Sequence, residues 1–235
     1  SAGQFGNDAR ETVQEILGRN HVPLVAGGSG LYIRALTEGF FKGEVKDPAK
    51  RKQLQKRLQH EGSESLYNEL DKIDPVTAQS IHPQNGKRII RALEVYYNTG
   101  RPLSRLWQKK NKPPDFSFVK FGLLMDRKQL YHRINERVER MFSHGLLEEV
   151  KNILSAGYSP ELNSLNTVGY KEVIDFLEEK TDYQTCVELV KRNTRRYAKR
   201  QMTWFNAEKD IRWLPVAGDD WLSELAGTII MEYRQ

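Results

Sequence analysis

The sequence predicts an α/β protein in which a parallel sheet with its helices is interrupted by an all-helical insertion. In the two outer parts of the chain, residues 1–41 and 116–235, short apolar runs alternate with helical patterns. Between them, over 42–115, no run is typical of a strand. Strands that alternate with helices favour a parallel sheet. We therefore expect a core domain made of both outer parts and a helical insertion domain between them.

The first outer part predicts a helix, a strand and a second helix. Apolar residues at helical spacing predict a helix over 7–19, with Asn7 or Asp8 as its cap. The apolar run VPLVA predicts a strand over 22–26, and LYIRAL predicts a helix over 30–38.

Between that strand and helix lies the loop Gly27-Gly28-Ser29-Gly30. A glycine loop before a helix often binds phosphate, because glycines let the backbone approach a ligand and a helix N-terminus attracts anions. No lysine follows the glycines, and no G-x-x-x-x-G-K-[ST] motif occurs in the chain. The loop alone therefore does not identify its ligand.

The middle of the chain predicts helices only. Leu54 and Leu58 lie one helical turn apart in the first of them, and Gly100 with Pro102 ends the last. The segment KKNKPPDFS, 109–117, has the paired prolines and clustered charge of a linker. The predicted helices span 49–62, 63–73, 74–81 and 87–100.

The second outer part returns to strands. A continuous apolar run predicts a strand over 117–125 that is buried on both faces. A long helix over 127–145 follows, with its inward side formed by Leu130, Ile134, Val138 and Met141. The remaining predicted elements are helices over 146–154, 170–180, 182–205 and 221–233, a loop over 156–169 and a strand over 211–216.

Composition limits the possible classes of protein. The 235 residues are 38% hydrophobic and 29% charged, and no apolar run approaches the roughly 20 residues of a membrane span. The single cysteine, Cys186, excludes a disulfide within the chain, and no pair of histidines has the spacing of a zinc site. We expect a cytoplasmic protein without membrane association. We also expect a monomer, because no segment is typical of an interface helix.

The strongest charge pattern lies on the predicted helix 182–205. Its cations recur at i, i+3, i+4, i+7 and i+8 and share one side of the helix: Arg192, Arg195, Arg196, Lys199 and Arg200. Tyr197 and Trp204 lie two turns apart and are able to stack on bases. The formal charge of +6 permits a nucleic-acid partner. The alternative is a solvated basic surface with Trp204 in the core.

Two smaller basic clusters also point to phosphate. Lys87, Arg88 and Arg91 lie at the start of a predicted helix, where cations oppose the helix dipole unless an anion compensates them. Arg133, Arg137 and Arg140 recur in the helix after the strand 117–125, at the edge of the sheet where α/β proteins bind ligands. The alternatives are a solvated helix start and ion pairs with glutamates of the same helix.

Several segments in this order resemble the tRNA dimethylallyltransferase (tRNA isopentenyltransferase) family. They include VPLVAGGSGLYIRAL, KRIIRALEVY, LYHRINERVERMF, NTVGYKE and YAKRQMTWF, and the resemblance spans nearly the whole chain. It implies a P-loop-NTPase-like parallel-sheet core and a helical insertion that binds the anticodon stem-loop of tRNA. Members transfer a dimethylallyl group from dimethylallyl diphosphate, with Mg²⁺, to the exocyclic amine of the adenosine 3′ of the anticodon.

The resemblance also implies roles for individual residues. Arg137 matches the arginine that stabilises the diphosphate. The residues that match tRNA-contacting positions are Gly27, Gly28, Ser29, Lys87, Arg88, Arg91, Asn166, Thr167, Val168, Gly169, Tyr170, Lys171, Lys199, Arg200, Gln201, Thr203 and Trp204. No residue of this chain matches a metal ligand.

The chain departs from the family pattern at its beginning. It has no initiator methionine, and the family's N-terminal P-loop and general-base aspartate are absent from it. We expect a fragment or part of a longer chain, and little prenyl transfer from these residues alone. Two other functions stay open: a non-catalytic RNA-binding module, and a relative of P-loop nucleotide kinases, which the YAKRQMTWF segment disfavours.

Overall fold

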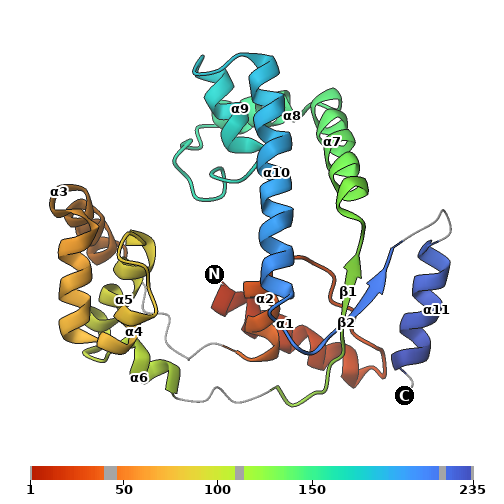
Figure 1. Ribbon diagram of the computed structural model, residues 1–235, viewed down its shortest axis with the longest axis horizontal. Helices are drawn as coiled ribbons and strands as arrows, with labels where there is room; N and C mark the ends of the chain where they lie inside the picture. The colour runs from red at the N-terminus through yellow and green to blue at the C-terminus, as the bar shows by residue number, and fades with distance from the viewer. Residues whose placement is uncertain (1, 40–46, 109–113, 217–220, 234–235) are drawn as a thin grey trace. The chain divides into compact units, whose positions relative to one another are not determined.

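The computed structural model describes residues 2–39, 47–108, 114–216 and 221–233 (Figure 1). These residues are mainly helical, with one small parallel sheet, which agrees with the predicted α/β class. The chain divides into two units, Ser1–Ser117 and Phe118–Gln235. The predicted domain boundary at 41 and 42, and most of the predicted linker, lie outside the described residues.

In the first unit, helices α1 (Ala2–Gly18) and α2 (Gly30–Thr37) pack against each other. Glycine permits their close approach, because a Cβ on Gly6 would lie 2.7 Å from the carbonyl oxygen of Ala35. The predicted helix 30–38 is thereby confirmed.

The predicted cap of the first helix is wrong. Helix α1 already begins at Ala2, so Asn7 and Asp8 lie inside it. The earlier start brings Phe5 onto Tyr32 of α2, where the two rings stack with centroids 4.8 Å apart. This contact between helices outweighs the low helix propensity of the glycine-containing start.

The predicted strand over 22–26 is also wrong. The structure has no regular element over 21–29, and Leu24 is 85% exposed. An apolar run becomes a strand only where another strand satisfies its backbone, and the described residues provide no such neighbour here.

The other described helices of the first unit are α3 (Pro48–Ile73), α4 (Pro75–Gln79), α5 (Gly86–Thr99) and α6 (Leu103–Gln108). Helix α3 breaks at Gly62, where φ is 80° and ψ is 171°, so its halves match the predicted helices 49–62 and 63–73. Helix α6 is not among the predicted elements. The shared core contains Leu54, Leu66, Leu70, Ala78, Ile81, Ile89, Ile90, Ala92, Leu93, Val95 and Leu103.

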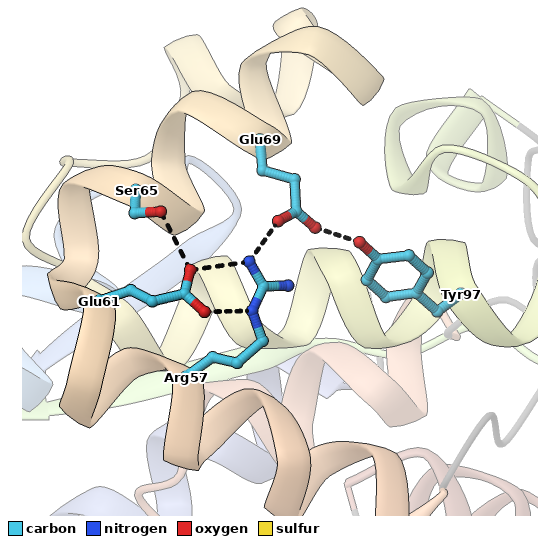
Figure 2. A network of polar contacts seen from close by, with 5 residues as sticks. All are labelled: Arg57, Glu61, Ser65, Glu69 and Tyr97. Atoms are coloured by element: carbon cyan, nitrogen blue, oxygen red, sulfur yellow. Dashed lines mark hydrogen bonds and ion pairs between the residues drawn. The ribbon is translucent and has the colours of Figure 1, made fainter.

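A polar network connects the two halves of α3 with α5 (Figure 2). Arg57 donates to Glu61 through Nε at 2.7 Å and Nη2 at 2.9 Å, and Nη2 also donates to Glu69 at 2.7 Å. The Tyr97 hydroxyl donates to the other oxygen of Glu69. Because Arg57 precedes Gly62 and Glu69 follows it, the network stabilises the angle at the break.

A buried carboxylate joins three of these helices. Asp74 follows α3 and caps α4, and it is 2% exposed. Its oxygens accept hydrogen bonds from Thr77 N at 3.1 Å, Thr77 Oγ1 at 2.7 Å and Ser104 N at 2.9 Å. Burial raises the pKa of Asp74, but the hydrogen bonds from Ser104 and Thr77 together outweigh it and lower the pKa below the ordinary value.

In the second unit, strands β1 (Lys120–Leu124) and β2 (Ile211–Pro215) pair in parallel. Gly122 lies opposite Trp213, and a Cβ on Gly122 would lie 2.7 Å from the indole ring. A larger residue at this point of the sheet would have to displace the side chains of Trp213 and Ile211.

The two predicted strands are confirmed in place, but the burial expected for the first is not. Leu123 is 50% exposed and Leu124 is 44% exposed, because the described sheet contains only β1 and β2.

The other described elements of the second unit are α7 (Arg127–Ser143), α8 (Leu146–Ser155), α9 (Tyr170–Leu177), α10 (Tyr183–Phe205) and α11 (Trp221–Tyr233). Strand β1 leads into α7, and α10 packs against both α7 and α9 (Figure 1). Of the inward residues predicted for α7, Ile134 and Val138 are buried, whereas Leu130 and Met141 are half-buried. The core contains Val138, Phe142, Leu146, Val150, Leu165, Val173, Ile174, Cys186, Val187 and Val190.

Candidate nucleic-acid interface

Helix α10 carries exposed cations along one side, which we name the basic stripe: Arg192, Arg196, Lys199 and Arg200. Arg192, Arg196 and Lys199 form no ion pair with any other residue that the structure describes. Like charges along one helix repel each other, so an uncompensated stripe favours an anionic partner.

Two more cations of α10 are used within the protein. Arg195 Nη1 donates to Asn135 Oδ1 on α7 at 2.6 Å, so Arg195 does not belong to the exposed stripe in which the prediction placed it. Lys191 Nζ contacts Glu139 on α7 at 2.9 Å and Glu188 at 3.0 Å. These two carboxylates raise the pKa of Lys191. The contacts join α7 to α10.

Aromatic and polar residues lie beside the stripe. Tyr197 is 44% exposed, and the Arg200 guanidinium lies 5.6 Å from its ring centroid. Thr203 is exposed and donates to the Lys199 carbonyl at 3.0 Å. Gln201 and Trp204 are half-buried, so Tyr197 presents more surface to a partner than Trp204.

Residues 166–171, which we name the 166–171 loop, lead into α9 and include its first two residues. Most of their side chains are exposed, and buried residues anchor the segment. Leu165 is 4% exposed, and Gly169 is buried with φ at +101°, a conformation that favours glycine. The Tyr170 hydroxyl donates to Glu149 on α8, which raises the pKa of Tyr170. The exposed residues of the loop are Asn166, Thr167, Val168 and Lys171.

Beneath this loop lies a residue that the sequence patterns did not single out. Glu172 is 6% exposed, and its carboxylate accepts hydrogen bonds from Gly169 N and from Asn193 Nδ2 on α10, each at 2.7 Å. The signal for the first bond is present in the sequence, because an acid three residues after a helix N-cap often reaches back to that residue. No local pattern predicts the second bond.

In the first unit, Lys87 and Arg88 are exposed at the beginning of α5. Asn85 caps the helix and accepts from Arg88 N at 3.3 Å. Arg91, in contrast, is half-buried and pairs with the buried Glu94 at 3.0 Å. Lys87 and Arg88 therefore offer their charge to a partner more freely than Arg91 does.

The glycine loop ahead of α2 is open. Gly27 is exposed, with nothing within 4 Å of where a Cβ would be. Gly28 and Ser29 are half-buried. Ser29 is the N-cap of α2 without a side-chain hydrogen bond to the helix, while its carbonyl accepts from Tyr32 N at 3.0 Å. The predicted loop-to-helix transition is confirmed here, although no strand precedes it.

Arg137 on α7 is exposed and forms no ion pair with any other described residue. Glu136 and Glu139, one and two residues away, do not face Arg137 on the helix, and Glu139 pairs with Lys191 on α10. Arg137 lies two residues from Asn135, about 200° around the helix. Since Asn135 faces α10, Arg137 points away from α10.

The described residues show no sign of metal binding, a reactive thiol or a membrane span. The described residues contain no group of three or more His, Cys, Asp or Glu side chains that could hold a metal ion. Cys186 is buried, and burial raises the pKa of its thiol to about 11. No helix of the described ranges is long and apolar enough to cross a membrane.

An open cavity of about 300 Å³ lies beside the 166–171 loop. Its lining contains both lysines and carboxylates, so the charge of the cavity favours neither anions nor cations. The lining residues are Pro160, Glu161, Leu165, Asn166, Lys171, Ile174, Asp175, Glu178 and Lys180.

The structure thus brings some predicted residues together. The basic stripe and the 166–171 loop belong to the second unit and are joined through the bonds of Glu172. Arg137 belongs to the same unit but lies on the side of α7 away from α10. The glycine loop and the cations of α5 belong to the first unit.

Comparisons with known proteins agree on one family. The profile of the family described as IPP transferase matches residues 1–208. A tRNA dimethylallyltransferase of Pelotomaculum thermopropionicum is 48% identical over 216 residues, covering 90% of this chain and 68% of the relative. That of Carboxydothermus hydrogenoformans is 42% identical over 234 residues, covering 99% of this chain and 75% of the relative.

Solved structures are similar as well. The tRNA isopentenylpyrophosphate transferase of Bacillus halodurans has a TM-score of 0.65 at 35% identity, covering 98% of this chain and 73% of that protein. A eukaryotic dimethylallyltransferase acting on tRNA has a TM-score of 0.80 at 26% identity, covering 99% of this chain and 62% of that protein.

Proposed function

This chain belongs to the IPP transferase family, and we propose that it is the RNA-binding part of a tRNA dimethylallyltransferase. The reaction transfers a dimethylallyl group from its diphosphate to the exocyclic amine of the adenosine immediately 3′ of the anticodon. The observation that carries the proposal is the uncompensated basic stripe beside the 166–171 loop, in a chain that tRNA dimethylallyltransferases match along most of its length.

The cations supply affinity for the phosphates of the anticodon stem-loop. In the second unit these are the cations of the basic stripe, and in the first unit they are Lys87 and Arg88, which are exposed. Their contacts release counterions, so binding is expected to weaken steeply with salt. Phosphate contacts position an RNA but do not read its sequence.

Recognition of the adenosine requires contacts to the base. A stacked base does not present its amine to an electrophile, so the target nucleotide must be turned out of the stack. We assign contacts near this nucleotide to the 166–171 loop. For the backbone at Gly27, Gly28 and Ser29, in the first unit, we propose contacts with the tRNA on the resemblance to the family. The exposed ring of Tyr197 offers a surface on which a neighbouring base can stack.

Arg137 acts on the leaving group. As the new carbon–nitrogen bond forms and the carbon–oxygen bond to the diphosphate breaks, negative charge develops on the diphosphate while the amine loses a proton to a base. A guanidinium with no competing carboxylate is suited to hold that charge.

Magnesium bound to the diphosphate would supply further charge neutralisation. The described residues hold no group of three or more His, Cys, Asp or Glu side chains that could bind the ion. We assign the two outer parts of the chain to a P-loop-type core and 42–115 to the tRNA-binding insertion, on the resemblance alone.

Binding of two RNA hairpins tests the proposal. They differ only in having adenosine or guanosine 3′ of the anticodon, and both are titrated across a salt series. Tight, salt-sensitive binding with a preference for adenosine supports the transferase function. Equal affinities with equal salt slopes would favour a non-catalytic RNA-binding module, and binding of a nucleotide without either hairpin would favour a kinase relative.

A further inference from the structure

We propose that Glu172 is a positioning residue for RNA recognition, holding the 166–171 loop in a fixed place relative to the basic stripe of α10. The inference rests on the proposed function. It adds a residue that acts through the loop and α10, and not by contact with the RNA or with dimethylallyl diphosphate.

The carboxylate bridges two segments that are distant in sequence. Its Oε2 accepts from Gly169 N at 2.7 Å, within the loop, and its Oε1 accepts from Asn193 Nδ2 at 2.7 Å, on α10. Each carboxylate oxygen therefore accepts one hydrogen bond, Oε2 from the loop and Oε1 from α10. Since the side chain is buried, water is not available to replace either donor.

The loop depends on this bridge for its conformation. Gly169 has φ at +101° and ψ at −60°, outside the helical region, and its N–H lies at the beginning of α9 where helix N–H groups lack helical partners. The negative carboxylate satisfies that N–H and is favoured by the helix dipole. Without it, a buried donor would remain unpaired and the loop would be free to move.

The other end of the bridge is placed among the RNA-binding cations. Asn193 directly follows Arg192 and precedes Arg196 by three residues on α10. The same carboxylate thus fixes Asn166, Thr167 and Val168 relative to the stripe. An RNA that contacts phosphates through the stripe and a base through the loop would lose affinity if the loop moved independently.

Breaking the bridge and then rebuilding it with exchanged polarity tests this. In Asn193→Asp, two carboxylates face each other, and their repulsion opens the α10 end of the bridge. In the double variant Glu172→Gln/Asn193→Asp, the new amide donates its NH₂ to the new carboxylate on α10. The oxygen of that amide still accepts from Gly169 N, so both bonds return with the negative charge moved to α10.

We expect Asn193→Asp to bind the adenosine hairpin about tenfold more weakly, the cost of ordering roughly one loop residue. The double variant should return to within about twofold of the unmodified chain. Affinities are measured well below the unfolding temperature, with circular dichroism confirming that each variant is folded. If Asn193→Asp does not fold, Asn193→Ala removes the α10 end of the bridge without adding a charge and carries the same expectation.

Cys186→Ala is the matched control. Its Sγ lies 3.3 Å from the Glu172 carbonyl oxygen and is buried, so the substitution disturbs the same core but leaves the carboxylate bonds intact. It should lower the unfolding temperature without changing hairpin affinity. Single variants at Asn193 that lower stability but bind the hairpin like the unmodified chain would overturn the inference. An unmodified chain that binds neither hairpin would overturn the proposed function, and this inference with it.

Discussion

The guanidinium of Arg195 on α10 donates a 2.6 Å hydrogen bond to Asn135 on α7, whereas its neighbour Arg196 is exposed. Consecutive residues of a helix lie about 100° apart. Two adjacent arginines of one basic run therefore have different roles: one joins two helices and the other is available to a partner.

Replacing these two arginines separately should separate the two roles. Arg196→Ala should weaken hairpin binding and reduce the slope of log affinity against log salt by about 0.7–0.9, the loss of one phosphate contact. Arg195→Ala should leave that slope unchanged and lower the free energy of unfolding by about 1–2 kcal/mol, because Asn135 loses its donor. Fluorescence anisotropy and urea unfolding measure the two effects. Identical behaviour of both variants would contradict the assignment of the stripe.

Arg137 should affect the diphosphate rather than the RNA. Since it points away from α10, Arg137→Ala should bind the hairpin with unchanged affinity and salt slope. Binding of inorganic pyrophosphate should weaken about tenfold on loss of a charge-assisted hydrogen bond. Arg140→Ala, which removes an exposed arginine one turn away, is the control and should bind pyrophosphate normally. Equal loss in both variants would show that pyrophosphate responds only to net charge.

The stability of the helical part of the first unit should depend on Asp74 in acid. Its pKa in the folded state is lowered relative to the ordinary value of 3.8, so its contribution is complete above that value and is lost as pH falls through the folded pKa. Asp74→Asn should be less stable than the unmodified chain at pH 7. This difference should shrink as the pH falls below about 4, which urea unfolding across the range measures. A difference independent of pH would mean that shape, not charge, stabilises this junction.

Close packing of α1 and α2 should make Gly6 intolerant of a side chain. A Cβ on Gly6 would lie 2.7 Å from the backbone oxygen of Ala35, which has little freedom to move, so Gly6→Ala should cost about 1–3 kcal/mol of stability. Gly18, at the end of the same helix, has nothing within 4 Å of its Cβ position. Gly18→Ala should be neutral or slightly stabilising, and thermal unfolding of both variants checks the difference.

The sequence predicted elements well where the signal is local. Helix periodicity located the helices apart from α6, and Gly62 and Gly100 marked a break and an end. Prediction failed where the structure of a segment depends on the strands that lie beside it in space. The run over 22–26 has the composition of a strand, but no described strand pairs with it. The burial of β1 was overestimated for the same reason, since an apolar run does not reveal how many strands flank it.

The candidate site was predicted in part. Charge spacing located the basic stripe, because cations at helical spacing share one side whatever the tertiary structure. It did not reveal that Arg195 bonds to Asn135, sixty positions away. It also missed the bond from Asn193 to Glu172, which depends on how α9 and α10 pack.

Photocrosslinking of the bound RNA tests the central claim most directly. The adenosine hairpin carries 4-thiouridine beside the target nucleotide, and the crosslinked peptides are identified by mass spectrometry. We expect crosslinks to residues of the 166–171 loop and to α10 near Tyr197, and any other pattern counts against this placement of the RNA. Crosslinks confined to α11 would contradict it.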